Sequence, residues 1–143
     1  MHFTEPTDEA VGFTADAPNG KTYYNTDAIV IFNSTASNIG GYYHPGSSIF
    51  LCPTEGMYAF FLSILTASQE RFYASIMKES ERLDSVFGET GDIEYFNNGV
   101  SNFIVTMCSK GERVWVRCLE VENAMYENYN RYNTFSGILL NRF

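Results

Sequence analysis

Short segments in which apolar and polar residues alternate follow one another along the whole chain. They are separated by turn-forming residues such as Pro18-Asn19-Gly20, Gly40-Gly41 and Asn98-Gly99, several of which favour a positive φ. A period of two residues is typical of half-buried strands, and regular turns between them indicate an antiparallel sandwich or barrel. The segments predicted as strands are 11–15, 28–33, 48–52, 57–65, 72–78, 103–108, 114–121 and 134–140.

The segment from Gln69 to Leu83 allows a second interpretation, because its later part is rich in residues with good helix propensity. Its apolar residues, however, recur at every second position, as Phe72, Ala74 and Ile76. That period fits a strand better than a helix.

Two hairpins are predicted from turn chemistry. Pro53-Thr54-Glu55-Gly56 follows the strand of Phe50, and Ser109-Lys110-Gly111-Glu112 follows the strand that ends at Cys108. Alternation around the second turn directs one set of side chains inward, namely Cys108, Val114, Val116 and Cys118. Met107, Trp115 and Arg117 then point outward, and an outward Trp115 is expected to meet a partner surface.

With 143 residues, of which 45% are hydrophobic, the chain can form one domain with a substantial core. We expect residues 1–10 to be a mobile lead-in and residues 11–143 to be the globular domain. A net charge of -8 with nine Lys and Arg residues argues against a nucleic-acid partner. The sequence has no apolar run of membrane-spanning length, and its first residues do not have the pattern of a secretory leader.

Catalytic groups are scarce. The histidines are His2, near the terminus, and His44, beside Pro45-Gly46 in a turn, so a nucleophile and base pair would depend on His44 alone. The odd number of cysteines and the lack of C-x-x-C spacing argue against structural zinc. Asn33-Ser34-Thr35 is a glycosylation acceptor motif, although such tripeptides also occur by chance. The sequence predicts a protein that is not an enzyme.

A set of residues spaced along the chain resembles the signature of one family. The set comprises Val11-Gly12-Phe13-Thr14-Ala15, Phe32, Asn38, Tyr43, Phe50, Gly56, Tyr58, Phe60, Phe96-Asn97-Asn98-Gly99, the segment from Lys110 to Val116, and Phe135-Ser136-Gly137-Ile138-Leu139-Leu140. In order and distance it is similar to the globular-head domain of complement C1q, which shares its fold with the tumour necrosis factor ligands. The chain departs from that pattern at Leu62, where an aromatic residue is usual.

The resemblance implies an all-β, ten-stranded antiparallel jelly-roll β-sandwich that forms a homotrimer. The aromatic content, with Phe 12, Tyr 10 and Trp 1, exceeds the need of one core and agrees with a trimer interface. The implied function is a secreted, lectin-like pattern recognition module of innate immunity. It would bind microbial surface polysaccharide, lipopolysaccharide or host proteins. The alternatives are a cytokine-like ligand that engages cell-surface receptors and a structural trimerising head.

Ligand contact is expected in the loops, because the strands use their side chains in the core and in the trimer interface. The two longest polar loops supply the candidate ligand-binding residues Glu89, Asp92, Glu94, Tyr126, Tyr129 and Tyr132. No cofactor is required, but Asp92 and Glu94 could hold calcium, because hard cations prefer several carboxylate oxygens on a flexible loop. In this fold Cys52 and Cys108 both lie before turns at one end of the sandwich, so a disulfide between them is expected.

Overall fold

The computed structural model describes residues 9–92, 94, 97–119 and 123–143, and this part of the chain contains strands and no helix. The all-β prediction is therefore confirmed. Residues 1–8, most of the expected lead-in, lie outside the described residues. The strands are β1 (Gly12–Asp16), β2 (Gly20–Tyr24), β3 (Ser34–Ile39), β4 (Tyr43–His44), β5 (Ile49–Leu51), β6 (Gly56–Thr66), β7 (Arg71–Lys78), β8 (Glu81–Glu89), β9 (Asn98–Cys108), β10 (Arg113–Cys118), β11 (Asn123–Glu127) and β12 (Thr134–Arg142).

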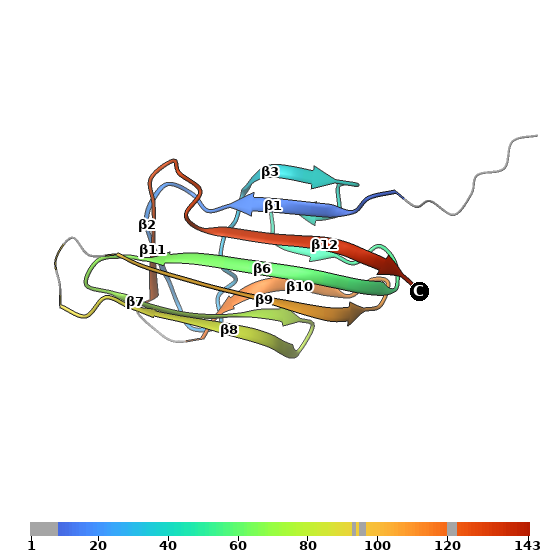
Figure 1. Ribbon diagram of the computed structural model, residues 1–143. Helices are drawn as coiled ribbons and strands as arrows, with labels where there is room; N and C mark the ends of the chain where they lie inside the picture. Colours follow the sequence, from blue (N-terminus) through green and yellow to red (C-terminus); the bar gives the residue numbers. More distant parts are fainter. Residues whose placement is uncertain (1–8, 93, 95–96, 120–122) are drawn as a thin grey trace, which may run out of the picture.

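Ten of these strands form two antiparallel sheets that pack face to face (Figure 1). Sheet I has the order β3-β1-β12-β6-β9, and sheet II has the order β4-β5-β10-β7-β8. The strands β2 and β11 pair with each other at one end of the sandwich. There Met125 of β11 pairs with Thr66 of β6, and Asn123 pairs with Arg71 of β7. The structure is thus the predicted ten-stranded jelly roll with an added ribbon that links both sheets.

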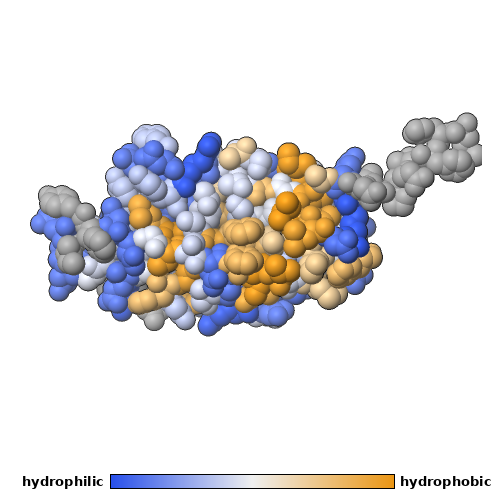
Figure 2. All heavy atoms as spheres, in the orientation of Figure 1, coloured by the Kyte–Doolittle hydropathy of each residue, from blue (hydrophilic) through white to orange (hydrophobic). Residues whose placement is uncertain are grey.

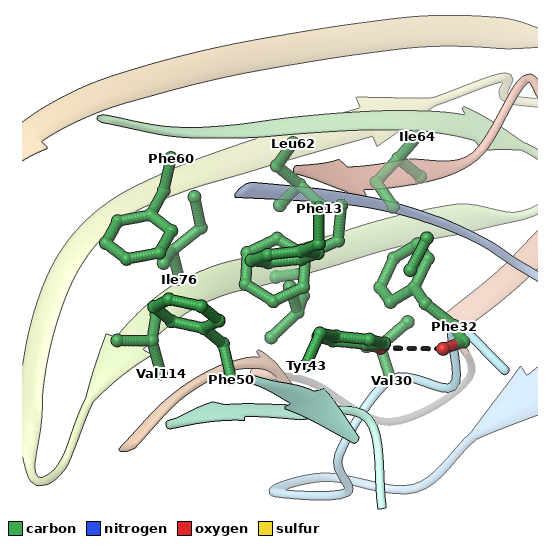
Figure 3. Packing of buried hydrophobic residues seen from close by; sticks show 14 of the residues in the cluster. Phe13, Val30, Phe32, Tyr43, Phe50, Phe60, Leu62, Ile64, Ile76 and Val114 are labelled. Atoms are coloured by element: carbon green, nitrogen blue, oxygen red, sulfur yellow. Dashed lines mark hydrogen bonds between the residues drawn. The ribbon is translucent and has the colours of Figure 1, made fainter. Parts of the chain in front are cut away.

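The sandwich core follows from the alternation along each strand. On β6, Phe60, Leu62 and Ile64 are buried, whereas Phe61 between them is 47% exposed. Figure 3 shows the three buried side chains in the space between the sheets, which they share with Ile76 of sheet II. Burial of one such large apolar side chain stabilises the fold by roughly 1.5 to 3 kcal/mol.

An aromatic cluster fills the centre of this core. The Phe13 ring stacks on Tyr43 at a centroid distance of 4.5 Å and meets Phe135 edge-on at 5.1 Å. Gly137 is required beside it, because a Cβ at this position would lie 2.6 Å from the Phe13 ring and 2.8 Å from the Phe60 ring. Several residues of the sequence signature therefore have a structural role in the core.

Asn38 and Tyr43 fix the turn between β3 and β4. The Asn38 amide donates to the Tyr43 carbonyl oxygen at 2.9 Å, and the Tyr43 N–H donates to Asn38 Oδ1 at 3.2 Å. The Tyr43 hydroxyl donates to the Phe32 carbonyl oxygen at 2.6 Å, a bond drawn in Figure 3. Burial raises the pKa of Tyr43 to about 12. Hydrogen bonding thus explains the presence of Asn38 and Tyr43 in the sequence signature.

Both turns predicted as hairpins instead cross from one sheet to the other. Strand β5 pairs with β4 and β10 in sheet II, whereas β6 pairs with β9 and β12 in sheet I. Likewise β9 belongs to sheet I and β10 to sheet II. The hairpin prediction was wrong because alternation and turn residues are the same whether the second strand pairs with the first or packs across the core from it.

Other strands also differ from the prediction. Residues 28–33 form no strand, and only Ile29 makes an isolated bridge, to Arg117. Strands β2, β3, β4, β8 and β11 were missed. On β3 every residue except Asn38 is exposed, so its sequence carries no apolar period. The strand interpretation of the 69–83 segment is confirmed, because β7 occupies Arg71–Lys78.

The predicted inward and outward side chains of β10 are correct, but Trp115 is less exposed than predicted. The inward set Cys108, Val114, Val116 and Cys118 is buried. Trp115 pairs with Met77 on the outer side of sheet II and is half-buried rather than exposed. It therefore offers much less free surface than the alternation predicted.

Candidate functional site

The two loops predicted to bind ligands lie at the same end of the sandwich, opposite the C-terminus (Figure 1). The β8–β9 connection and the end of β8 carry Glu89, Asp92 and Glu94, and the β11–β12 connection carries Tyr129 and Tyr132. The connections β1–β2 and β6–β7 reach the same end. This end therefore combines polar segments that are far apart in the sequence.

A hollow of about 430 Å³, here named hollow A, opens between the β1–β2 and β11–β12 connections. Its lining is mostly polar and consists of Asp16, Ala17, Asn19, Ser34, Glu127, Tyr129, Asn130 and Arg131. A volume of this size is within the range of about 300 to 1,000 Å³ that is usual for small-molecule sites.

The buried Glu127 carboxylate holds the β11–β12 connection in shape. It accepts hydrogen bonds from four N–H groups: the backbone N–H groups of Asn128, Asn130 and Asn133 and the Asn133 amide. Burial alone would raise the pKa of Glu127, but these hydrogen bonds favour the charged form and together lower it below its usual value. Glu127 therefore organises the loop, and its lone pairs are already occupied.

The same connection contains two residues with left-handed backbone conformation. Tyr129 and Arg131 both have a φ of 54°, which is unfavourable for residues other than glycine. The Tyr129 N–H donates to Asn19 Oδ1 at 2.6 Å, which ties the loop to the β1–β2 connection. The Tyr129 side chain lines hollow A and is 83% exposed.

Asp16 and Arg131 form an ion pair in hollow A. Arg131 Nε donates to Asp16 Oδ2 at 2.9 Å. Asp16 is only 7% exposed, and among the described residues its second oxygen, Oδ1, has no hydrogen-bond partner. Buried carboxylate oxygens are nearly always paired. This oxygen is an exception, and it has almost no surface that a molecule in hollow A could contact.

A second hollow of about 190 Å³, hollow B, is lined by Gln69, Glu70, Arg71, Glu89, Gly91 and Asp92. It contains two of the predicted ligand residues, Glu89 and Asp92. Glu70 is already bound, because Tyr23 donates to it at 3.0 Å and Lys21 forms an ion pair with it at 3.2 Å.

The described residues give the calcium prediction no support. Among them, no group of three or more His, Cys, Asp and Glu side chains could hold a metal ion. Asp92 and Glu94 are both exposed, and Glu94 does not line hollow B. Calcium binding through this pair stays a prediction.

The predicted tyrosines do not form one surface with these carboxylates. Tyr129 lines hollow A, Tyr126 is half-buried on β11, and Tyr132 is 43% exposed. The Tyr132 carbonyl oxygen accepts a hydrogen bond from Ser63 of sheet I at 3.2 Å. The structure thus divides the predicted set between the two hollows, strand β11 and the loop end beside β6.

A different surface feature lies on the outer face of sheet I. Its register places Ile39, Gly12, Ile138, Ala59 and Val105 at matching positions on five adjacent strands. In the neighbouring row the exposed rings of Phe61 and Phe103 stack at 5.3 Å. Figure 2 shows hydrophobic residues gathered over this side of the molecule. The exposed apolar residues of the face are Ile39, Phe61, Phe103, Val105, Met107, Ile138 and Leu140, each 47% exposed or more.

The model of the C1q domain matches residues 12–140, nearly the whole chain. The chain belongs to the C1q domain family. Caprin-2 of Danio rerio is 29% identical over 141 residues, which cover 98% of this chain and 15% of that protein. Human complement C1q tumor necrosis factor-related protein 3 is 27% identical over 119 residues, which cover 82% of this chain and 47% of that protein. The C1q domain described here therefore spans less than half the length of each of these relatives.

Solved structures confirm the jelly-roll fold. The globular domain of zebrafish complement 1qA protein matches with a TM-score of 0.75 at 18% identity, covering 93% of this chain and 99% of that chain. Eiger TNF from S. frugiperda matches with a TM-score of 0.74 at 13% identity, covering 92% of this chain and 93% of that chain. No helix that could span a membrane is present in the described part of this C1q domain.

The predicted cysteine pair is close in space. Cys52 and Cys108 are buried free thiols that share a hydrogen bond, which together with burial raises the pKa of Cys52. Cys118 is the third buried free thiol. The structure contains no disulfide between Cys52 and Cys108, so that bond stays a prediction that their contact makes sterically reasonable.

Sequence reasoning missed the residues that organise hollow A in this C1q domain. Asp16, Glu127 and Arg131 have no shared spacing, and Asp16 is far from the other two in the sequence. The Asp16-Ala17-Pro18-Asn19-Gly20 segment signals a turn after a strand. It does not signal that this turn lies beside the β11–β12 connection.

Proposed function

We propose that this C1q domain is a non-catalytic extracellular recognition module that acts as a homotrimer. Its ligands are microbial surface polysaccharide or lipopolysaccharide, or host proteins, and the contact is made by the loop end. The observation that carries the proposal is the division of the surface into an apolar sheet face and a polar end.

The apolar face of sheet I supports association between copies of this chain. Phe103 is 57% exposed although it stacks on Phe61, so in a monomer a large part of this aromatic surface stays in contact with water. An aromatic pair that is removed from water at an interface contributes roughly 1 to 3 kcal/mol. Contiguous exposed apolar patches of this kind are typical of interaction surfaces.

The position of the loops supports multivalent binding. In a trimer built around the face of sheet I, three copies of the loop end would lie on the same side of the assembly. A surface with repeated epitopes can then occupy several weak sites at once, which raises the apparent affinity by about 10² to 10⁴ without a new contact. Polysaccharides and lipopolysaccharide layers are surfaces of this type.

The alternative is a cytokine-like ligand for a cell-surface receptor. The likeness to Eiger TNF, at 13% identity, concerns the fold and does not separate these two functions. The same trimer could serve either function. Binding to microbial surfaces or to host cells therefore distinguishes the two functions.

The test is retention of the purified protein on sensor surfaces of immobilised lipopolysaccharide, mannan and β-glucan, with binding to intact host cells measured in parallel. We expect saturable retention on at least one microbial surface, with an apparent affinity at least 100-fold higher than that of a variant that cannot trimerise. Retention on host cells alone would contradict glycan recognition and favour the cytokine-like function. No retention on any surface would favour a structural trimerising head.

A further inference from the structure

The acceptor tripeptide Asn33-Ser34-Thr35 lies at the surface, directly after a buried aromatic residue. Phe32 is fully buried, its N–H donates to Ser48 Oγ at 2.9 Å, and its carbonyl oxygen accepts from the Tyr43 hydroxyl at 2.6 Å. All three residues of the tripeptide are exposed. The folded chain therefore presents the tripeptide to solvent next to a position that is fixed in the core.

The two side-chain groups that an N-glycosylation acceptor requires are both free. The motif consists of an Asn amide and a hydroxyl two residues later, with any residue except proline between them. Among the described residues, no hydrogen bond or ion pair involves the Asn33 amide or the Thr35 hydroxyl. A tripeptide buried in the core would be a chance match, whereas this one can carry a glycan without loss of a contact.

Strand β3, which begins at Ser34, is an edge strand of sheet I. In the described part of the chain it pairs with β1 alone, so one side of its backbone faces away from the sheet (Figure 1). Charged residues or proline usually protect such an edge from pairing with another chain. Ser34–Ile39 contains neither, although its register shifts opposite Thr14 and Ala15. A glycan at the residue before the strand would protect this edge.

We propose that Asn33 carries an N-linked glycan, which shields the open edge of β3. In the transfer, Asn33 Nδ2 forms a bond to the anomeric carbon of a lipid-linked oligosaccharide diphosphate, and the bond from that carbon to the phosphate oxygen breaks. The lipid diphosphate leaves with the electron pair of the broken bond, and the amide nitrogen gives up one proton. Donor and enzyme belong to the secretory pathway. The inference therefore rests on the extracellular location in the proposed function, but not on recognition of a ligand.

A glycan at Asn33 is compatible with a trimer built on the apolar face of sheet I. Asn33 lies at the loop end, where the next residue, Ser34, pairs with Asp16. Ile39 of the apolar face lies at the other end of β3, roughly 20 Å away at about 3.3 Å per residue. Phe61 lies on β6, three strands from β3, which is roughly 14 Å at the usual strand spacing. Since Ser34 also lines hollow A, a ligand of the loop end would approach that hollow past the glycan.

The first test is secretion of the full chain from cultured animal cells behind a cleavable secretory leader. We expect the protein in the medium to be heavier than the 16.2 kDa chain by one glycan. Peptide N-glycosidase should remove that mass and leave Asp in place of Asn33, which peptide mapping locates. Thr35→Ser keeps the hydroxyl and should keep the glycan, whereas Asn33→Gln and Thr35→Ala should each be secreted without it.

The second test concerns the shielding of β3 and compares aggregation rates at one protein concentration and temperature. Thr35→Ala lacks the glycan and should aggregate several times faster than the glycosylated protein. Thr35→Lys also lacks the glycan but places a charge on the edge strand, so it should aggregate slowly. The double variant of Thr35→Ala with Asn25→Lys is the matched control, because it adds the same charge at an exposed position outside β3. It should aggregate as fast as Thr35→Ala.

An unmodified mass for the secreted protein would overturn the inference, because the chain would have met the enzyme and its donor without reacting. A glycan that persists in Thr35→Ala would overturn it as well, since the modification would lie elsewhere. The shielding of β3 is wrong if Thr35→Ala aggregates as slowly as the glycosylated protein, or if Asn25→Lys slows aggregation as much as Thr35→Lys does. A glycosylated protein that no microbial surface retains would contradict the proposed glycan recognition and leave this inference standing.

Discussion

Glu127 and Asn133 join three parts of the loop end through side-chain hydrogen bonds. Asn133 is fully buried, and its Oδ1 accepts from the Leu65 N–H of β6 at 2.6 Å. Its amide donates to the Tyr126 carbonyl oxygen at 2.6 Å and to Glu127 at 3.3 Å. The Ala17 N–H donates to the Asn133 carbonyl oxygen at 3.1 Å. These bonds connect β6 and β11 to the β1–β2 connection.

The first prediction at this scale concerns Glu127→Gln. A glutamine keeps the size but turns an N–H donor towards backbone donors, so we expect it to destabilise the protein by about 1 to 3 kcal/mol at pH 7. The pKa of Glu127 is lowered in the folded state. Its contribution is therefore complete above the unfolded pKa of about 4.3 and is lost as the pH falls through the folded pKa.

Thermal melting at one fixed protein concentration between pH 2 and pH 8 measures this effect. The gap between the unmodified protein and Glu127→Gln should be widest near neutral pH and should narrow in acid. Glu79→Gln, which removes an exposed ion pair, should leave the neutral melting temperature nearly unchanged. An equal melting temperature for Glu127→Gln at pH 7 would show that the carboxylate does not hold the loop.

At the scale of elements, the turns at 53–56 and 109–112 carry the chain from one sheet to the other. The two turns are adjacent: the Cys52 N–H donates to the Glu112 carbonyl oxygen at 2.9 Å, and the Gly111 N–H donates to the Cys52 carbonyl oxygen at 2.8 Å. The expectation that Cys52 and Cys108 lie close together was therefore met, although the hairpin pairing was wrong. Turn residues predict where a strand ends, whereas the strand that becomes its neighbour depends on contacts across the whole chain.

A prediction for these elements is that oxidative refolding joins Cys52 to Cys108 and leaves Cys118 reduced. The two thiols are already in contact, and closing a loop of this length stabilises the folded state by about 4 kcal/mol in the chain-entropy model. Peptide mapping without reductant should recover one linked peptide pair. Recovery of three free thiols after complete refolding in an oxidising buffer would reject the bond.

At the scale of the whole molecule, the family signature predicted the jelly roll and its core but not the residues of hollow A. The signature residues Phe13, Tyr43, Phe50 and Gly137 pack against one another in the core, so their spacing depends on the fold itself. Asp16 and Arg131 meet only because β1 and the β11–β12 connection end at the same place. A contact of that kind has no local pattern in the sequence.

The trimer is the central claim, because multivalent recognition depends on it. Phe103 on β9 and Phe87 on β8 offer a matched comparison, since each is an exposed aromatic residue on the edge strand of one sheet. Phe103 is 57% exposed and pairs with Phe61 on the apolar face of sheet I. Phe87 is 48% exposed and pairs with Tyr73 on sheet II.

Sedimentation equilibrium of the unmodified protein, Phe103→Glu and Phe87→Glu at tens of micromolar is the most direct measurement. The unmodified protein and Phe87→Glu should have three times the mass of the 16.2 kDa chain, whereas Phe103→Glu should be a monomer, because it places a charge in an apolar interface. A monomeric unmodified protein, or a trimer that persists in Phe103→Glu, would contradict assembly through the face of sheet I.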